Sequence, residues 1–446
     1  MTRFDPEGEA RSEALRRLGD GFQNLPDFNP PRLDAGDRAV LDQVAERLQD
    51  NFPYHHPLYA GQMLKPPHPL AREAYQLAMR LNPNNHALDG GRASSAMEKE
   101  AVAGLAGMVG WSEHLGHLTS GGTVANLEAL WVAGRLRPGE RILGSAAAHY
   151  THARISAVLG LDYQPVAMDV RGRMDLAALS GALEAGGAGT VVVTLGTTGL
   201  GAVDPLNGIL PLAVEHGVRV HVDAAYGGYF RLLDDFPADV AAAFDALAEA
   251  DSVVIDPHKH GLQPYGCGCV LFRDPTVGRL YRHDSPYTYF TSSDLHLGEI
   301  SLECSRAGAA AVALWATQQR LPLTAGGAFA DGLRAGRLAA LDLHHRLATD
   351  DRFLTVAAPD LDIVVFAPAA DGTAAGISAA AERVFERAAA DGLHLALIRL
   401  EGSFLEKVWP GFAATGAVTC LRSCLMKPEH RDWLDAIWSR LTAALD

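Results

Sequence analysis

Short apolar runs that alternate with longer helical patterns are the feature that most limits how this chain can fold. Continuous strands rich in Val, Ile and Leu, separated by helices, indicate a mostly parallel sheet with both faces covered by helices. The expected strands are residues 117–119, 141–144, 163–168, 190–195, 218–223, 252–255 and 267–272. The expected helices between them are residues 123–135, 151–159, 174–185 and 205–216. We therefore expect an α/β fold built on a seven-stranded sheet.

The sequence pattern differs before and after the residues in which expected strands and helices alternate. Residues 1–85 are rich in Pro, His and Asn and hold two helical patterns, so we expect an N-terminal arm that packs on something larger. Residues 86–325 carry the alternation and are expected to form the large domain. Residues 326–446 begin with a long helical pattern and continue with strands that flank further helices. This last part predicts a small C-terminal α+β domain.

Composition and charge exclude several classes of partner. The 446 residues include 38 Lys and Arg against 53 Asp and Glu, a formal net charge of −15, and no block of basic residues stands out. A nucleic-acid partner is therefore not expected. The N-terminal residues lack the apolar region of a secretory signal, and no apolar run reaches the length of a membrane span. We expect a cytoplasmic protein that acts on a small molecule.

Cysteine and histidine patterns do not indicate a metal. The five cysteines are an odd number, sparse for this length, and include no CxxC pair, which favours reduced thiols. Two histidine pairs, at 55–56 and 344–345, lack a third ligand at suitable spacing. We expect no bound metal.

The segment SGGT, Ser120 to Thr123, joins an expected strand to an expected helix. Glycines let the backbone approach an anion, and the N–H groups and dipole at a helix start favour a phosphate. The segment lacks the GxxxxGK[ST] of a nucleotide loop and the GxGxxG of a dinucleotide fold, so the expected anion is a single phosphate. A tight turn without a ligand is the alternative.

Asp223 and Lys259 lie at the carboxyl ends of two expected strands, where α/β sheets usually bind ligands. A carboxylate can keep a ring nitrogen protonated, and a lysine amine can be used chemically. The 36 residues between them correspond to about one strand-to-strand crossover, so both side chains can reach the same edge of the sheet. Taken singly, the alternatives are a helix cap at Asp223 and a surface charge at Lys259.

Two more polar residues follow expected strands. His149 comes after residues 141–144, and an imidazole at that edge can stack on a planar ring. Thr197 and Thr198 lie in a glycine-flanked loop after residues 190–195, where a hydroxyl can reach a phenolic oxygen. Each has a plainer explanation when taken alone, since a histidine at a helix start is often a cap or a solvated residue.

Together, a phosphate turn, a flat stacking group, a carboxylate and a lysine are the set that pyridoxal 5′-phosphate requires. At these residues the sequence resembles the group II pyridoxal-phosphate-dependent amino-acid decarboxylases, which include glutamate, aromatic-amino-acid and tyrosine decarboxylases. The most specific element is DPHK, which ends at Lys259. The stretches SGGTVANL, LGTT and HVDAAYGG match in the expected order.

The resemblance implies a fold-type I transferase architecture and a homodimer with active sites at the interface. It implies that Lys259 carries the cofactor through a Schiff base and that Asp223 pairs with the pyridine nitrogen. His149 and Ala225 would sandwich the ring, and Thr197 would approach the phenolic oxygen. The phosphate would be held by Ser120, Gly121, Gly122, Thr123 and His258.

The residues that would contact the substrate are less closely defined. Tyr287 and Tyr289 compete for the role of proton donor to the substrate carbon, with His258 as the alternative donor. Arg422 lies in an apolar strand, where an unpaired charge is costly. An internal salt bridge is the plain explanation, while the resemblance implies contact with a substrate carboxylate. His55 and Tyr59 are expected on the substrate side.

We interpret the chain as an enzyme that decarboxylates an L-amino acid to its amine and releases CO2. Two other reactions of the same cofactor, retro-aldol cleavage and transamination, use the same cofactor residues and stay open. A non-catalytic binding protein on this fold would need no lysine at position 259. The substrate side chain also stays open, since Arg422 and the histidines suit an acidic one. Aromatic residues such as Tyr54, Tyr59, Phe290 and Trp315 suit an aromatic one.

Overall fold

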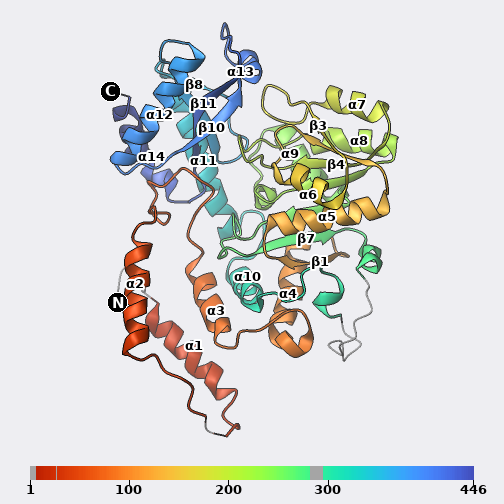
Figure 1. Cartoon of the computed structure of the whole chain (residues 1–446), viewed down its shortest axis with the longest axis vertical. Helices are drawn as coiled ribbons and strands as arrows, with labels where there is room; N and C mark the ends of the chain where they lie inside the picture. The colour runs from red at the N-terminus through yellow and green to blue at the C-terminus, as the bar shows by residue number, and fades with distance from the viewer. Residues whose placement is uncertain (1–6, 27, 282–294, 446) are drawn as a thin grey trace.

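A seven-stranded sheet forms the centre of the larger part of the molecule, as Figure 1 shows. The structure is a computed structural model that describes residues 7–26, 28–281 and 295–445. The strand order is β1-β7-β6-β5-β4-β2-β3, and only β7 runs antiparallel to its neighbours. The strands are β1 (Leu115–Thr119), β2 (Arg141–Ser145), β3 (Tyr163–Val166), β4 (Ala188–Thr194), β5 (Arg219–Asp223), β6 (Ser252–Ile255) and β7 (Gly268–Phe272). The mostly parallel sheet expected from the sequence is confirmed.

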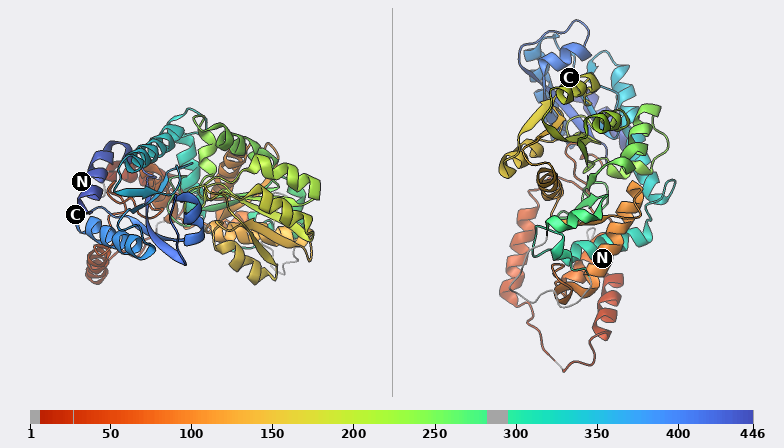
Figure 2. Two further views of the ribbon diagram at one scale, coloured as in Figure 1. Left: turned by 90° about the horizontal axis from the view of Figure 1, so that it is seen from above. Right: turned by 90° about the vertical axis from the view of Figure 1, so that its right-hand side faces the viewer.

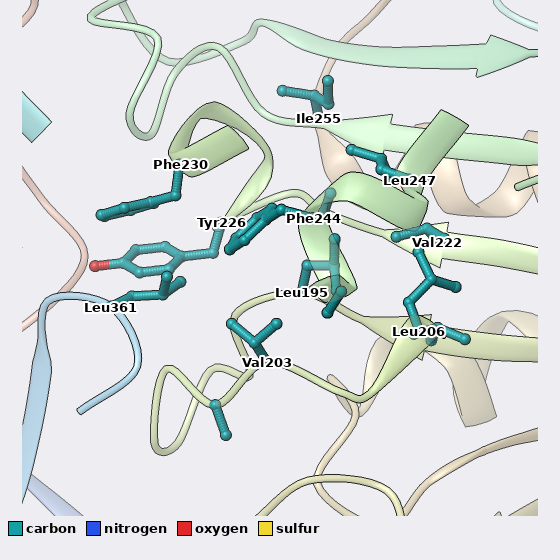
Figure 3. Packing of buried hydrophobic residues seen from close by; sticks show 14 of the residues in the cluster. Leu195, Val203, Leu206, Val222, Tyr226, Phe230, Phe244, Leu247, Ile255 and Leu361 are labelled. Carbon is teal, nitrogen blue, oxygen red and sulfur yellow. The ribbon is translucent and has the colours of Figure 1, made fainter. Parts of the chain in front are cut away.

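Side chains of the central strands alternate between two hydrophobic clusters, one on each face of the sheet. In β4, Val191 and Val193 belong to the cluster shown in part in Figure 3, whereas Val192 belongs to a cluster on the other face. In β6, Val253 and Val254 divide in the same way. Every residue of these two strands is buried except Ala188. Their sequences are therefore continuous apolar runs, without the alternation of apolar and polar residues that a half-exposed strand shows.

Helices cover both faces. The helices α5 (Gly122–Leu136) and α6 (Thr151–Leu159) supply the residues buried on one face. The helices α4 (Leu88–Val109), α7 (Leu176–Glu184), α8 (Leu206–His216) and α9 (Ala238–Asp245) supply buried residues to the other, and α10 (Gly308–Arg320) packs on α4. Four short 3-10 helices, not foreseen from the sequence, are Gly228–Leu232, Ala246–Glu249, Pro275–Leu280 and Leu297–Glu299.

A second sheet of four antiparallel strands, in the order β10-β11-β9-β8, forms the small C-terminal part. Its strands are β8 (Phe353–Thr355), β9 (Ile363–Pro368), β10 (Ala396–Glu401) and β11 (Ala417–Cys424). Its helices are α11 (Ala328–Ala348), α12 (Ala374–Ala390), α13 (Gly402–Val408) and α14 (His430–Ala443). The small α+β part is therefore confirmed, and we propose the division at residue 325 as its boundary.

The N-terminal region carries three helices that differ in how much they pack. The helices are α1 (Gly8–Asp20), α2 (Ala35–Leu48) and α3 (Pro69–Met79). Figures 1 and 2 show α2 reaching away from the rest of the chain, whereas α1 lies against α3 and α3 packs on α10. Arg11 Nη1 of α1 donates to Glu73 Oε2 of α3 at 3.1 Å. Between α2 and α3, the chain touches the small sheet, since Ala60 donates its N–H to His394 O at 2.9 Å. No helix in the described ranges is long and apolar enough to cross a membrane.

Candidate active site

A cleft of about 380 Å³ opens beyond the carboxyl ends of the parallel strands. Most of the residues predicted to bind a cofactor meet here, although they come from loops more than a hundred residues apart. Its lining includes Ser120, Gly121, Gly122, Thr123, His149, Thr198, Asp223, Ala225, Asp256, His258 and Lys259. The side chains gather because successive parallel strands end at the same edge of the sheet.

The turn between β1 and α5 forms one end of the cleft. Helix α5 begins at Gly122, so the N–H groups of Gly122 and Thr123 have no acceptor inside the helix and can bind an anion. The backbone here is crowded: a Cβ on Gly122 would lie 2.6 Å from Asp256 Oδ2. Ser120 differs from its neighbours, since its N–H donates to Glu303 Oε2 at 2.9 Å.

Asp223 is a buried carboxylate at the end of β5, with only 5% of its surface exposed. Its Oδ2 accepts a hydrogen bond from His152 Nε2 at 2.8 Å, and its Oδ1 accepts the N–H of Ala225 at 3.1 Å. Burial raises the pKa of Asp223, but the His152 hydrogen bond and the charge of Lys259 outweigh it and hold that pKa well below its usual range. The side chain is therefore a fixed anion that faces the cleft.

His152 is a residue that the sequence reasoning missed. It is fully buried in the first turn of α6, and its Nδ1 has no partner among the described residues. Because a carboxylate can only accept, Nε2 of His152, which faces Asp223, is the donor in this hydrogen bond. A signal for it exists in the sequence, since His149 and His152 are three residues apart and so lie on one face of a helix start.

Lys259 follows β6 and reaches the cleft with 21% of its side chain exposed. Its Nζ lies 3.1 Å from Asp256 Oδ2, and the neighbouring His258 Nε2 lies 3.5 Å from the same oxygen. The other oxygen of Asp256, Oδ1, is buried without a partner among the described residues. Asp256 was not among the predicted site residues, although it begins the DPHK motif, and the structure places it between the lysine and the glycine turn.

His149 and Ala225, which we expect to sandwich the cofactor ring, both line the cleft. His149 is half-buried, and its Nδ1 accepts the N–H of Thr151 at 3.2 Å. Burial lowers the pKa of His149, and the charge of Lys259 lowers it further against the opposing effect of Asp223. Its ring is therefore neutral near pH 7, which suits a stacking role. Burial likewise lowers the pKa of His258.

The prediction for Thr197 is wrong in its position. Thr197 is fully buried, and its Oγ1 accepts the N–H of Ala202 at 3.1 Å, so its hydroxyl serves the loop and not the cleft. Thr198 lines the cleft in its place. Two adjacent threonines in a tight loop point to different sides, and the sequence does not tell which one faces the ligand.

Arg422 lies next to the cleft without lining it. Its Nη1 donates to Thr198 O at 2.8 Å, and its Nη2 donates to Gln62 Oε1 at 2.6 Å. The internal salt bridge considered for this residue is not formed with any described residue, since both partners are neutral oxygens. A guanidinium held only by neutral oxygens keeps its full charge available to an anion.

Two residues predicted on the substrate side, Tyr59 and His55, do not line the cleft. Tyr59 is buried, with its carbonyl bound to Lys427 Nζ, and His55 is exposed. Tyr287 and Tyr289 lie outside the described residues. Trp315, considered for an aromatic pocket, lines a surface hollow beside α1 instead.

Sequence comparison relates this chain to enzymes that use the cofactor predicted above. Residues 73–368 match the pyridoxal-dependent decarboxylase conserved domain. The L-tyrosine decarboxylase of Levilactobacillus brevis is 28% identical over 411 residues, a match that covers 70% of this chain and 65% of that protein. A probable L-tyrosine/L-aspartate decarboxylase of Methanothrix thermoacetophila is 30% identical over 332 residues, which covers 73% of this chain and 80% of that protein.

Solved structures share the fold over nearly the whole chain. Mouse CSAD in its apo form superposes with a TM-score of 0.78 at 21% identity, covering 96% of this chain and 91% of that one. The Oryza sativa TDC structure with PLP and tryptamine also reaches 0.78, at 18% identity, and covers 100% of both chains. The fold-type I architecture is therefore confirmed.

The close approach of β7 to the glycine turn gives a testable prediction. A Cβ on Gly268 would lie 2.5 Å from the carbonyl carbon of Gly121, so Gly268→Ala must displace the turn. We expect its affinity for pyridoxal 5′-phosphate to fall by about tenfold or more, measured by titration of the apoenzyme. Gly107→Ala is the control, because its Cβ meets no atom within 4 Å. Equal affinities in the two variants would contradict the placement of the phosphate at this turn.

Proposed function

This chain belongs to the pyridoxal-dependent decarboxylase family, and from that premise we propose that Lys259 and Asp223 are the central residues of its amino-acid decarboxylase site. The observation that carries the proposal is that a buried, ionised Asp223 and the amine of Lys259 line one cleft together with the glycine turn. A non-catalytic binding protein would not need a buried carboxylate, a lysine amine and a glycine turn in one cleft. The family match favours decarboxylation over retro-aldol cleavage and transamination.

The residues of the cleft fit pyridoxal 5′-phosphate. A side chain at position 122 would collide with Asp256. Only glycine therefore fits here, and its backbone can face the phosphate of the ligand. Asp223 offers an anion for the pyridine nitrogen, and the neutral ring of His149 and the methyl group of Ala225 offer flat, uncharged surfaces. When bound, the cofactor supplies an electron sink for the pair of electrons released from a bond to the α-carbon.

Lys259 is the amine that we propose carries the cofactor, and Asp256 is its partner. A lysine attacks a carbonyl only after its ammonium has lost a proton. Asp256 Oδ2, at 3.1 Å from Nζ, is placed to hold and orient the lysine side chain in the cleft. His258 lies beside the same carboxylate and the glycine turn, which supports its role at the phosphate end.

The hydrogen bond from His152 helps to keep Asp223 ionised. Burial alone would favour the neutral acid, which cannot keep a pyridine nitrogen protonated. The donor at Nε2 of His152 and the N–H of Ala225 compensate for the lost water and also fix the direction of the carboxylate. We propose that His152 acts through Asp223 as a positioning residue.

The substrate side of the site is proposed from three features. Thr198, and not Thr197, takes the role of the hydroxyl near the phenolic oxygen. Arg422, held beside Thr198, is the group for a substrate carboxylate. Tyr287 or Tyr289 stays our proposal for the proton donor to the substrate carbon. L-tyrosine and L-aspartate, named for the relatives, are the first substrates to test.

We propose that the enzyme is a homodimer. Helix α2 has no buried residue in the single chain, although Val40, Leu41, Val44 and Leu48 are large apolar side chains. A helix of 14 residues that buries nothing is unstable by itself, so a second copy of the chain is the natural partner for this surface. A cytoplasmic location is proposed as well, and the five free cysteines support it.

The function is tested by supplying the holoenzyme with L-tyrosine, L-aspartate, L-glutamate and L-tryptophan and measuring CO2 and amine. We expect equal amounts of both products from at least one of them and no turnover in Lys259→Ala. Borohydride treatment of the wild type should attach the cofactor to Lys259. Lys407→Ala, at an exposed position of α13, is the control and should keep full activity. An aldehyde or keto acid formed without CO2 would overturn the proposal.

The role of His152 predicts a pH effect with a definite sign. His152→Leu removes the strongest of the interactions that oppose the burial of Asp223, so the pKa of Asp223 rises and the carboxylate is protonated at higher pH. The loss of kcat on the acid side should therefore begin at higher pH than in the wild type. His152→Gln keeps an N–H donor and should restore the profile.

The control for this prediction is His216→Leu, at an exposed position near the end of α8. A purely structural role for His152 would lower kcat equally at all pH values. That result, or an unchanged profile in His152→Leu, would refute the positioning role.

A further inference from the structure

A second cavity, of about 260 Å³, lies apart from the active-site cleft and shares no lining residue with it. It is formed by three parts of the chain: residues 65–69 of the N-terminal region, residues near His260 and Leu321 of the large domain, and residues around Phe329 and Lys427 of the small one. None of these residues has a role in the proposed reaction.

Two lysines line this cavity, and neither has an ion-pair partner within 4 Å among the described residues. Lys427 is 3% exposed, and its Nζ donates to Tyr59 O at 2.6 Å. Lys65 is half-buried, and its Nζ donates to Met426 O at 3.3 Å. An ammonium carries three N–H donors, so one carbonyl leaves two of them unmet, although the Lys427 ammonium also lies 5.3 Å from the centre of the Tyr59 ring in a cation–π contact. Removing such a charge from water without an anion is costly.

The electrostatics of the two lysines agree with this geometry. Burial lowers the pKa of Lys65 and of Lys427 to about 8. The charge of Lys65 lowers the pKa of Lys427 as well, so the two ammonium groups repel each other. An anion between them would relieve both effects.

The nearby carboxylates compensate these charges only in part, since the charges of Asp362 and Glu429 raise the pKa of Lys65 less than burial lowers it. Asp362 is engaged elsewhere, since its Oδ1 accepts the hydroxyl of Tyr226 at 2.6 Å and its Oδ2 lies 3.2 Å from His260 Nε2. Glu429 is exposed at the rim and makes no ion pair with either lysine in the described part of the chain. His260 adds a further unmet polar atom, because it is 1% exposed and its Nδ1 has no partner among the described residues.

Apart from His68, most of the remaining cavity wall is apolar. It is formed by Pro66, Pro67, Pro69, Leu262, Leu321, Phe329 and Leu333. Ligand cavities usually combine such a wall with a few charged groups that fix orientation. We propose that this cavity binds a small organic carboxylate, with its anionic end between Lys65 and Lys427 and its apolar body against the prolines and Phe329. Such a ligand would join the N-terminal region to both domains.

Benzoate is the probe that tests this site, and calorimetric titration of the holoenzyme measures its binding. We expect benzoate to bind the wild type, and Lys65→Met and Lys427→Met each to weaken binding by about tenfold or more. Glu429→Gln should tighten binding, because it removes a negative charge from the rim. Lys407→Met, at an exposed lysine outside the cavity, is the matched control and should bind as the wild type does. Benzyl alcohol, a neutral molecule of the same shape, should not bind.

Two measurements keep the test independent of folding and of the active site. Lys65→Met and Lys427→Met should retain cofactor absorbance and melt no lower than the wild type in buffer without carboxylates, because each removes an uncompensated charge. Saturating amino-acid substrate should leave benzoate binding unchanged. The proposal fails if benzoate does not bind, if the lysine variants bind it as the wild type does, or if substrate displaces it. It also fails if inorganic phosphate binds as tightly, since the apolar wall would then contribute nothing.

Discussion

The buried carboxylate of Asp223 is the interaction on which the rest of this site depends. A carboxylate taken out of water normally gains a proton, and a protonated Asp223 could not act on a ring nitrogen. The structure prevents this with two donors, His152 Nε2 and the N–H of Ala225, together with the charge of Lys259. Each donor comes from a different element, α6 or the loop after β5, so the charge exists only when the domain is folded.

The architecture explains why these groups meet. Strands β4, β5 and β6 are parallel neighbours with fully buried interiors, so their carboxyl ends form a rigid edge. Asp223 is the last residue of β5, and the DPHK segment begins directly after β6. Antiparallel β7 then brings Gly268 against Gly121, which places the glycine turn across the same edge. The order and register of the strands thus bring the glycine turn, the Asp223 carboxylate and the Lys259 amine to one edge of the sheet.

The parallel sheet, its covered faces and the residues at the strand ends could be predicted from the sequence, because burial on both faces leaves continuous apolar runs. Lys259, Asp223, His149 and the glycine turn follow from their place after those runs. The contacts that hold and orient these residues could not be predicted in the same way. The choice of Thr198 over Thr197 and the neutral partners of Arg422 depend on packing between distant segments. Asp256 is only three residues from Lys259, but its side-chain direction depends on the fold of the loop after β6. His152 shows the same limit, because a histidine in the first turn of α6 does not indicate that its partner lies 71 residues away.

The most direct test of this account is the protonation state of the ring nitrogen in the bound cofactor. It can be measured by 15N NMR of the holoenzyme reconstituted with pyridoxal 5′-phosphate labelled at that atom, in the wild type and in Asp223→Asn. The account predicts a protonated nitrogen in the wild type and loss of that proton in the variant, because an amide no longer supplies a negative charge. The same chemical shift in both proteins, or an unprotonated nitrogen in the wild type, would contradict it.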